Sequence, residues 1–111
     1  MDLLEELNIK IKELNKSIKS LRHTGTEYAE AERAYKVCLR EHALRLRAEK
    51  NMPVTLIGQV VYGVPEVAEK RFTRDVAEAV YRANQEAINS IKLQIRVIEG
   101  QINREWVNTR D

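Results

Sequence analysis

The stretch FTRDVAEAVYRANQEAINSIKLQIRVIEGQINREW, residues 72–106, decides the fold of this chain. It contains no proline and a single glycine, Gly100. Its apolar residues recur at steps of three or four, which places them on one face of an α-helix. A helix of this length cannot bury such a stripe by itself, so we expect partner helices along it. The stripe consists of Phe72, Val76, Val80, Ala83, Ala87, Ile91, Ile95, Ile98, Ile102 and Trp106.

The N-terminal part of the chain carries a second apolar stripe. Asp2 stands where an N-cap is expected, and Glu5 has the spacing of a capping box. We predict a first helix over about residues 2–50, because Pro53 cannot continue a helix and disfavours the helical conformation in the residue before it. The stripe follows a heptad spacing through Leu4, Leu7, Ile11, Leu14, Ile18 and Leu21.

Continuity of the first helix through Gly25 is the least certain local feature. Glycine costs a helix interior about 1 kcal/mol relative to alanine, and Thr24 with Glu27 could open a new capping box. The heptad phase nevertheless survives the crossing, since Tyr28 follows Leu21 by seven residues. The preserved phase favours one continuous helix, and a break at Gly25 is the alternative.

Two long helices joined by a short one make up the predicted fold. A short helix over about residues 53–62 is apolar nearly all round, so we expect it to be buried on more than one side. A final helix over about residues 65–108 would be ~65 Å long, close to ~72 Å for the first. We therefore predict an all-α fold, a long antiparallel helical hairpin forming a single helical domain over 1–111. Two helices alone make a poor core, so we expect a homodimer or higher oligomer that completes a bundle.

Composition gives little direction about function. The 111 residues carry a net charge of +2, which forces neither nucleic acid nor an anionic membrane as a partner. The one cysteine excludes an internal disulfide. No apolar run approaches the ~20 residues needed to span a bilayer, and acidic residues stand where a signal peptide carries basic ones. We expect a cytoplasmic protein without membrane contact.

The sequence offers no set of residues that would carry catalysis or bind a cofactor. Cys38 and His42 are spaced four apart, as two metal ligands can be, but zinc needs three or four protein ligands and His23 is the only other histidine. No nucleophile elbow and no glycine-rich phosphate loop is present. We therefore expect neither an enzyme, nor a metal site, nor a cofactor.

Two groups of basic residues are candidates for binding. Four of them form a basic stripe on the first helix, interrupted by Glu32 and Glu41: Arg33, Lys36, Arg40 and Arg47. The simpler interpretation of this stripe is a solvated helix face, and the alternative is a binding surface for an acidic partner or a phosphate backbone. Residues 53–74 have a helix-turn-helix outline, and in that alternative Lys70, Arg71 and Arg74 would contact DNA. The simpler interpretation of this segment is a connector folded over the end of the hairpin.

Four short motifs carry a resemblance to a group of proteins. They are YAEAERAY at residues 28–35, MPVTLI at residues 52–57, RDVAE at residues 74–78, and Glu105-Trp106. Together they resemble small uncharacterised helical proteins encoded by phages and prophages of Gram-positive bacteria. The resemblance implies a phage protein expressed in the cytoplasm of a bacterial host, and it transfers no binding or catalytic residue.

These observations leave three hypotheses about function. The first is an interaction protein that binds a host or phage protein through a helix face or through the connector tip around Met52 to Tyr62. The second is a DNA-binding protein that uses residues 53–74. The third is an architectural subunit of a phage assembly. Composition does not separate them.

Overall fold

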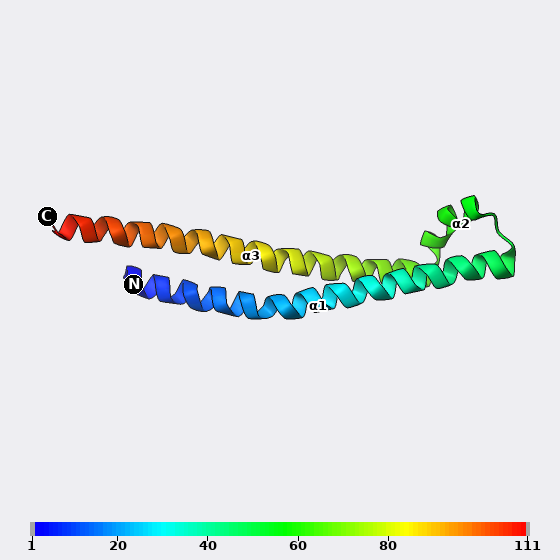
Figure 1. Ribbon diagram of the computed structural model, residues 1–111, viewed down its shortest axis with the longest axis horizontal. Coiled ribbons are helices and arrows are strands. Elements are labelled where there is room, and N and C mark those ends of the chain that lie inside the picture. Colours follow the sequence, from blue (N-terminus) through cyan, green and yellow to red (C-terminus); the bar gives the residue numbers. More distant parts are fainter. Residues whose placement is uncertain (1, 111) are drawn as a thin grey trace. The chain divides into compact units, whose positions relative to one another are not determined.

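The computed structural model describes residues 2–110 and consists of helices joined by short connections (Figure 1). Helix α1 spans Leu3–Lys50, α2 spans Val54–Val60, the 3-10 helix η1 spans Val61–Gly63, and α3 spans Pro65–Arg110. No strand occurs among the described residues. The predicted all-α helical hairpin is therefore confirmed, and each predicted helix boundary lies within about three residues of the observed one. The single domain and the dimer stay predictions.

Helix α1 is continuous through Gly25, as the preserved heptad phase predicted. The glycine allows a close approach: a Cβ added to it would lie 3.2 Å from Cε1 of Tyr81 on α3. The Tyr81 ring also packs against the ring of Tyr28, with 5.9 Å between centroids. At Gly25 the Tyr81 ring therefore occupies the space that the side chain of a larger residue would need.

The end of α1 is set by local chemistry. Asn51 adopts a left-handed conformation with φ 49°, which ends helices at low cost in asparagine and glycine. The guanidinium of Arg47 donates a hydrogen bond of 3.0 Å to the carbonyl oxygen of Met52. Pro53 then caps α2, and its carbonyl oxygen accepts hydrogen bonds from the backbone N–H groups of Leu56 and Ile57.

The chain divides into two compact units. Residues Thr24–Tyr81 form the connector unit, and the described residues up to His23 and from Arg82 onward form the terminal unit. The core of the connector unit joins both long helices to α2 and η1, with Leu39, Leu46 and Met52 packed around it. Its buried members are Tyr35, Cys38, Ile57, Val61 and Val67.

Aliphatic contacts hold the terminal unit together, and a long-range hydrogen bond joins its two helices. Ile88 and Ile98 of α3 are buried there. The side-chain amide of Asn84 donates to the carbonyl oxygen of Ser17 at 3.0 Å. At its N-terminal end the Asp2 carboxylate accepts a 2.8 Å hydrogen bond from the Glu5 backbone N–H, as the predicted cap requires.

The structure corrects part of the apolar stripe on α3. Ile91, Ile95, Ile98 and Ile102 are buried or half-buried, as expected. Six other members are exposed. In the connector unit the inward positions of α3 are taken by residues such as Val67 and Tyr81 on another side of the helix. The exposed members are Phe72, Val76, Val80, Ala83, Ala87 and Trp106.

The first stripe is also only half covered. Leu7, Leu14 and Leu21 are half-buried, while Leu4, Ile11 and Ile18 are exposed. In a pair of helices each helix covers only one side of the other. The part of the apolar stripe that lies outside this contact stays in water. None of the described helices combines the length and the apolar character that a membrane crossing requires.

We predict that Gly25→Ala will stabilise the protein by less than the about 1 kcal/mol that alanine normally gains over glycine in a helix. The new Cβ must displace the Tyr81 ring, which lies 3.2 Å from its position. In a Tyr81→Leu background the same change should recover nearly the whole gain. Urea denaturation of the four proteins gives a double-mutant cycle, and additive effects would show that the two residues do not restrict each other.

Candidate functional site

The outer side of the connector exposes a group of large apolar side chains. α2 has seven residues, and it packs inward through Ile57 while Val61 follows at the start of η1. The expectation that this segment is buried on more than one side is wrong within the chain, because a single layer of core lies beneath it. Four large side chains, called the apolar tip here, stay exposed: Val54 at 71%, Leu56 at 43%, Val60 at 38% and Tyr62 at 45%.

Charged side chains border the apolar tip. The guanidinium of Arg71 stacks over the ring of Tyr62, 5.6 Å from its centroid. At the turn before α2, Arg47 donates a hydrogen bond to the carbonyl oxygen of Met52. An apolar centre with a charged border is the ordinary anatomy of a protein–protein interface.

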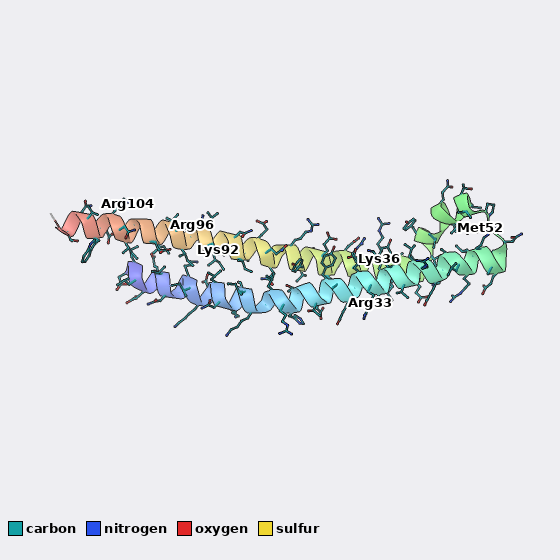
Figure 2. The ribbon with its side chains drawn as sticks, viewed as in Figure 1. Arg33, Lys36, Met52, Lys92, Arg96 and Arg104 are labelled. Carbon is teal, nitrogen blue, oxygen red and sulfur yellow. The ribbon has the colours of Figure 1, made fainter. Side chains whose placement is uncertain are left out.

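The basic stripe lies along α1, with Arg33 and Lys36 labelled in Figure 2. All four of its members are exposed, but they are not equally available. Lys36 forms an ion pair with Glu32 at 3.8 Å, and Arg47 donates a hydrogen bond to the carbonyl oxygen of Met52. A second set of exposed cations, which sequence reasoning did not single out, occurs on α3 in the terminal unit and comprises Lys92, Arg96 and Arg104 (Figure 2).

Two of the three cations in the DNA-binding alternative make contacts within the chain. Arg74 lies 4.8 Å from the centroid of the Tyr35 ring and 3.7 Å from the carboxylate of Glu32 on α1. Its side chain is only 19% exposed, and it also pairs with Asp75 at 2.7 Å. The hydrogen bond to Asp75 raises the pKa of the Arg74 guanidinium. Arg74 therefore connects α1 to α3, Arg71 stacks on Tyr62, and Lys70 is exposed.

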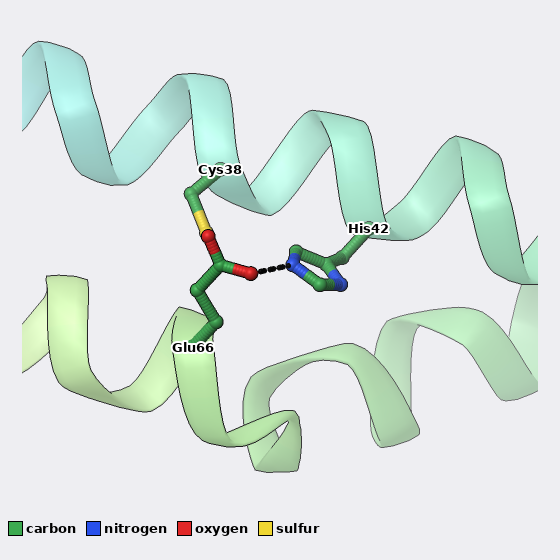
Figure 3. Close-up of side chains that lie close together, drawn as sticks. All are labelled: Cys38, His42 and Glu66. Carbon is green, nitrogen blue, oxygen red and sulfur yellow. Dashed lines mark hydrogen bonds and ion pairs between the residues drawn. The ribbon is translucent and has the colours of Figure 1, made fainter.

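The structure also brings Glu66 to the pair of Cys38 and His42. Cys38 and His42 lie on consecutive turns of α1, and Glu66 lies in the first turn of α3 (Figure 3). Nε2 of His42 and Oε2 of Glu66 are 2.8 Å apart. One donor atom from each of the three residues lies within 4.8 Å of the other two. Figure 3 shows the Glu66 carboxylate between the Cys38 sulfur and the His42 ring.

Electrostatics at this cluster disfavour a nucleophilic cysteine. Burial raises the pKa of the Cys38 thiol, and the negative charges of Glu66 and Glu41 raise it further against the opposing effect of Lys70 and Arg45. The thiol is therefore protonated at neutral pH in the metal-free chain, and the thiolate is the reactive form. The carboxylate also lies where the histidine of a Cys-His-acid triad would have to be, so the cluster does not have the order that such catalysis needs.

Sequence reasoning missed Glu66 because it counted only cysteines and histidines as zinc ligands and left out the carboxylates. In an antiparallel hairpin the first turn of the second helix returns beside the last turns of the first, so an acidic residue just after Pro65 is brought near Cys38 and His42. The predicted hairpin thus contained the signal for this third member.

We predict that Arg74→Met will lower the free energy of unfolding by about 1–3 kcal/mol, because it removes a shielded cation–π contact and the ion pairs that Arg74 makes with Glu32 and Asp75. Arg71→Met is the matched control, and it should cost less than about 1 kcal/mol because its contact with Tyr62 is exposed. Urea denaturation monitored by circular dichroism measures both. Equal losses in the two variants would argue against a structural role specific to Arg74.

The chain was compared with protein-family models, with curated proteins and with solved structures, and none of them matches it. Its function is therefore inferred from its own residues.

Proposed function

We propose that this chain is a small non-enzymatic interaction protein that binds another protein through the apolar tip. The observation that supports this most is the exposure of Val54, Leu56, Val60 and Tyr62 on one short connector. The resemblance to phage and prophage proteins supplies the proposed setting, a phage-encoded protein in the cytoplasm of a bacterial host, and a host or phage protein as the partner.

Physical chemistry favours a bound state for this surface. A helix of seven residues is too short to be stable on its own, so α2 depends on the core beneath it. A bound partner would stabilise α2 from its exposed side. Covering a large aliphatic side chain contributes roughly 1.5–3 kcal/mol. Tyr62 adds an aromatic group of the type that dominates interface energetics.

The border of the apolar tip indicates the chemistry of the partner. Arg71 lies at Tyr62, and Arg47 lies at the turn before α2. A partner with an apolar groove flanked by carboxylates would complement both features, with the groove supplying affinity and the carboxylates orientation. The basic stripe, through Arg33, Lys36 and Arg40, extends the positive surface along α1.

DNA binding is the weaker candidate because its cations are engaged. Arg74 is shielded between Tyr35 and Glu32, and Arg71 stacks on Tyr62. The helix that would enter the groove is the start of α3, which has 46 residues. Recognition helices of helix-turn-helix proteins belong to compact helical units in which a neighbouring helix crosses the DNA backbone.

Self-association is a second proposal, and it rests on the terminal unit. Leu4, Ile11 and Ile18 form an exposed row at heptad spacing on α1. On another side Ile9, Leu93 and Val97 line an open groove of about 590 Å³. A second copy could set the row of one chain into the groove of the other and complete a bundle. This is also the contact that an architectural subunit would need.

The proposal is tested by capturing partners from host and phage-infected lysates in the presence of nuclease. The chain, tagged at one terminus, serves as the bait. The variant Val54→Ser/Leu56→Gln/Val60→Thr should lower capture at least about tenfold, because it removes the apolar centre and leaves Ile57 and Val61 in the core. Val37→Thr/Leu44→Gln is the matched control, since both residues are exposed apolar side chains on α1, and it should leave capture unchanged.

Two outcomes would contradict this assignment. Unaltered capture by the tip variant would exclude the tip as the binding surface. Loss of capture in the charge-reversal variant Arg33→Glu/Lys36→Glu/Arg40→Glu, with the tip variant unaffected, would assign the interaction to the basic stripe instead. Arg47 is left unchanged in this variant because it holds the end of α1.

Self-association is tested by light scattering on the purified chain at micromolar concentration. We expect twice the chain mass, and Leu4→Gln/Ile11→Gln/Ile18→Gln should shift the protein toward the monomer because it makes the exposed row polar. The control Val37→Thr/Leu44→Gln should keep the dimer. A monomer that melts cooperatively at these concentrations would contradict the dimer.

A further inference from the structure

We propose that Cys38, His42 and Glu66 bind a zinc ion that fastens the C-terminal part of α1 to the first turn of α3. This proposal is independent of the function of the apolar tip. It concerns residues of the connector unit alone, and it predicts a property that can be measured on the isolated protein.

The geometry of the three side chains is close to that of a zinc site. Ligand atoms of a tetrahedral zinc ion lie about 3.3–3.6 Å apart, given bond lengths of about 2.0–2.3 Å. The three donor atoms lie within 4.8 Å of one another, and the shortest separation, 2.8 Å, joins Nε2 of His42 to Oε2 of Glu66. Small side-chain rotations that open the hydrogen bond and draw the sulfur inward would bring all three to zinc distances.

The backbone already holds the ligands in place. Cys38 and His42 are one helical turn apart, which puts both donors on the same face of α1. Cys38 belongs to the core of the connector unit and is 5% exposed. Glu66 is held near them because Val67, the next residue, is completely buried in the same core. The ion would therefore join elements that packing has already brought together.

The donor set selects zinc over the hard divalent cations. A thiolate and an imidazole suit zinc, whereas magnesium and calcium take oxygen ligands. Binding would release the thiol proton, and the thiolate with the Glu66 carboxylate would balance the two positive charges of the ion. The surrounding charges are mixed, since Glu41 lies near the cluster together with Lys70 and Arg45.

The fourth coordination position would face solvent. The side chain of Glu66 is 63% exposed and that of His42 14%, so the cluster opens outward past the carboxylate. A water molecule from this side would complete the tetrahedron. The ion would then close the loop that runs from His42 through α2 and η1 to Glu66, and so restrict the segment that carries the apolar tip.

The test is metal binding by the full untagged chain, freed of metal with a chelator and kept reduced. Titration with zinc in a calorimeter should give one ion per chain, and the thermal midpoint should rise with zinc concentration. Cobalt serves as a spectroscopic probe. It should give a sulfur-to-metal charge-transfer band and the visible bands of a tetrahedral ion, and zinc should displace it.

Variants separate a zinc site from a buried cysteine beside a histidine–carboxylate pair. Cys38→Ser and His42→Gln should weaken zinc binding at least about a hundredfold, and Glu66→Gln about tenfold or more. Glu66→Gln is the decisive variant because the residue is exposed and its amide keeps the shape and can still bond to His42. Glu41→Gln and His23→Gln are the controls, and both should bind zinc as the unchanged chain does.

Two results would overturn the proposal. The first is the absence of a charge-transfer band with cobalt together with zinc binding no tighter than millimolar. The second is zinc affinity that Cys38→Ser and Glu66→Gln leave unchanged, or that His23→Gln abolishes. Either would leave the cluster as a core cysteine next to a histidine–carboxylate hydrogen bond.

Discussion

The structure depends on one constraint: each long helix packs against other helices on one side only, so only that side is buried. In the connector unit that side is organised around the core of Tyr35, Cys38, Ile57, Val61 and Val67. In the terminal unit it consists of aliphatic contacts around Ile88 and Ile98. The other apolar residues of the two stripes are only half-buried or exposed, and this surplus is the reason to infer that the protein acts by binding.

The sequence was sufficient to predict where the helices begin and end. It was insufficient to predict which side of each helix is buried. Helix ends follow from local chemistry, and the proline at 53, the cap at Asp2 and the proline at 65 each mark a boundary within a few residues of the observed one. Which side of a helix faces inward depends on the partner. Phe72, Val76 and Val80 form a clear stripe in the sequence, yet Val67 and Tyr81 occupy the inward side of that part of α3.

For the candidate sites too, the sequence predicted some features and only the structure shows the others. The basic stripe could be read from the sequence because its spacing is helical, but the role of Arg47 at the Met52 turn and of Arg74 between Tyr35 and Glu32 could not. The apolar character of α2 was evident, whereas its exposure was not, since exposure depends on how much core lies above and below it. Glu66 joins Cys38 and His42 only because the chain reverses direction between them.

We propose that the apolar tip is the surface by which this protein binds its partner. Hydrogen–deuterium exchange, measured on the free chain and on the captured complex, tests it most directly because it reports the backbone of each segment separately. The account predicts that binding slows exchange in the peptides covering Met52 to Val64 more than anywhere else. Protection confined to α1 around the basic stripe, with the connector unchanged, would contradict it.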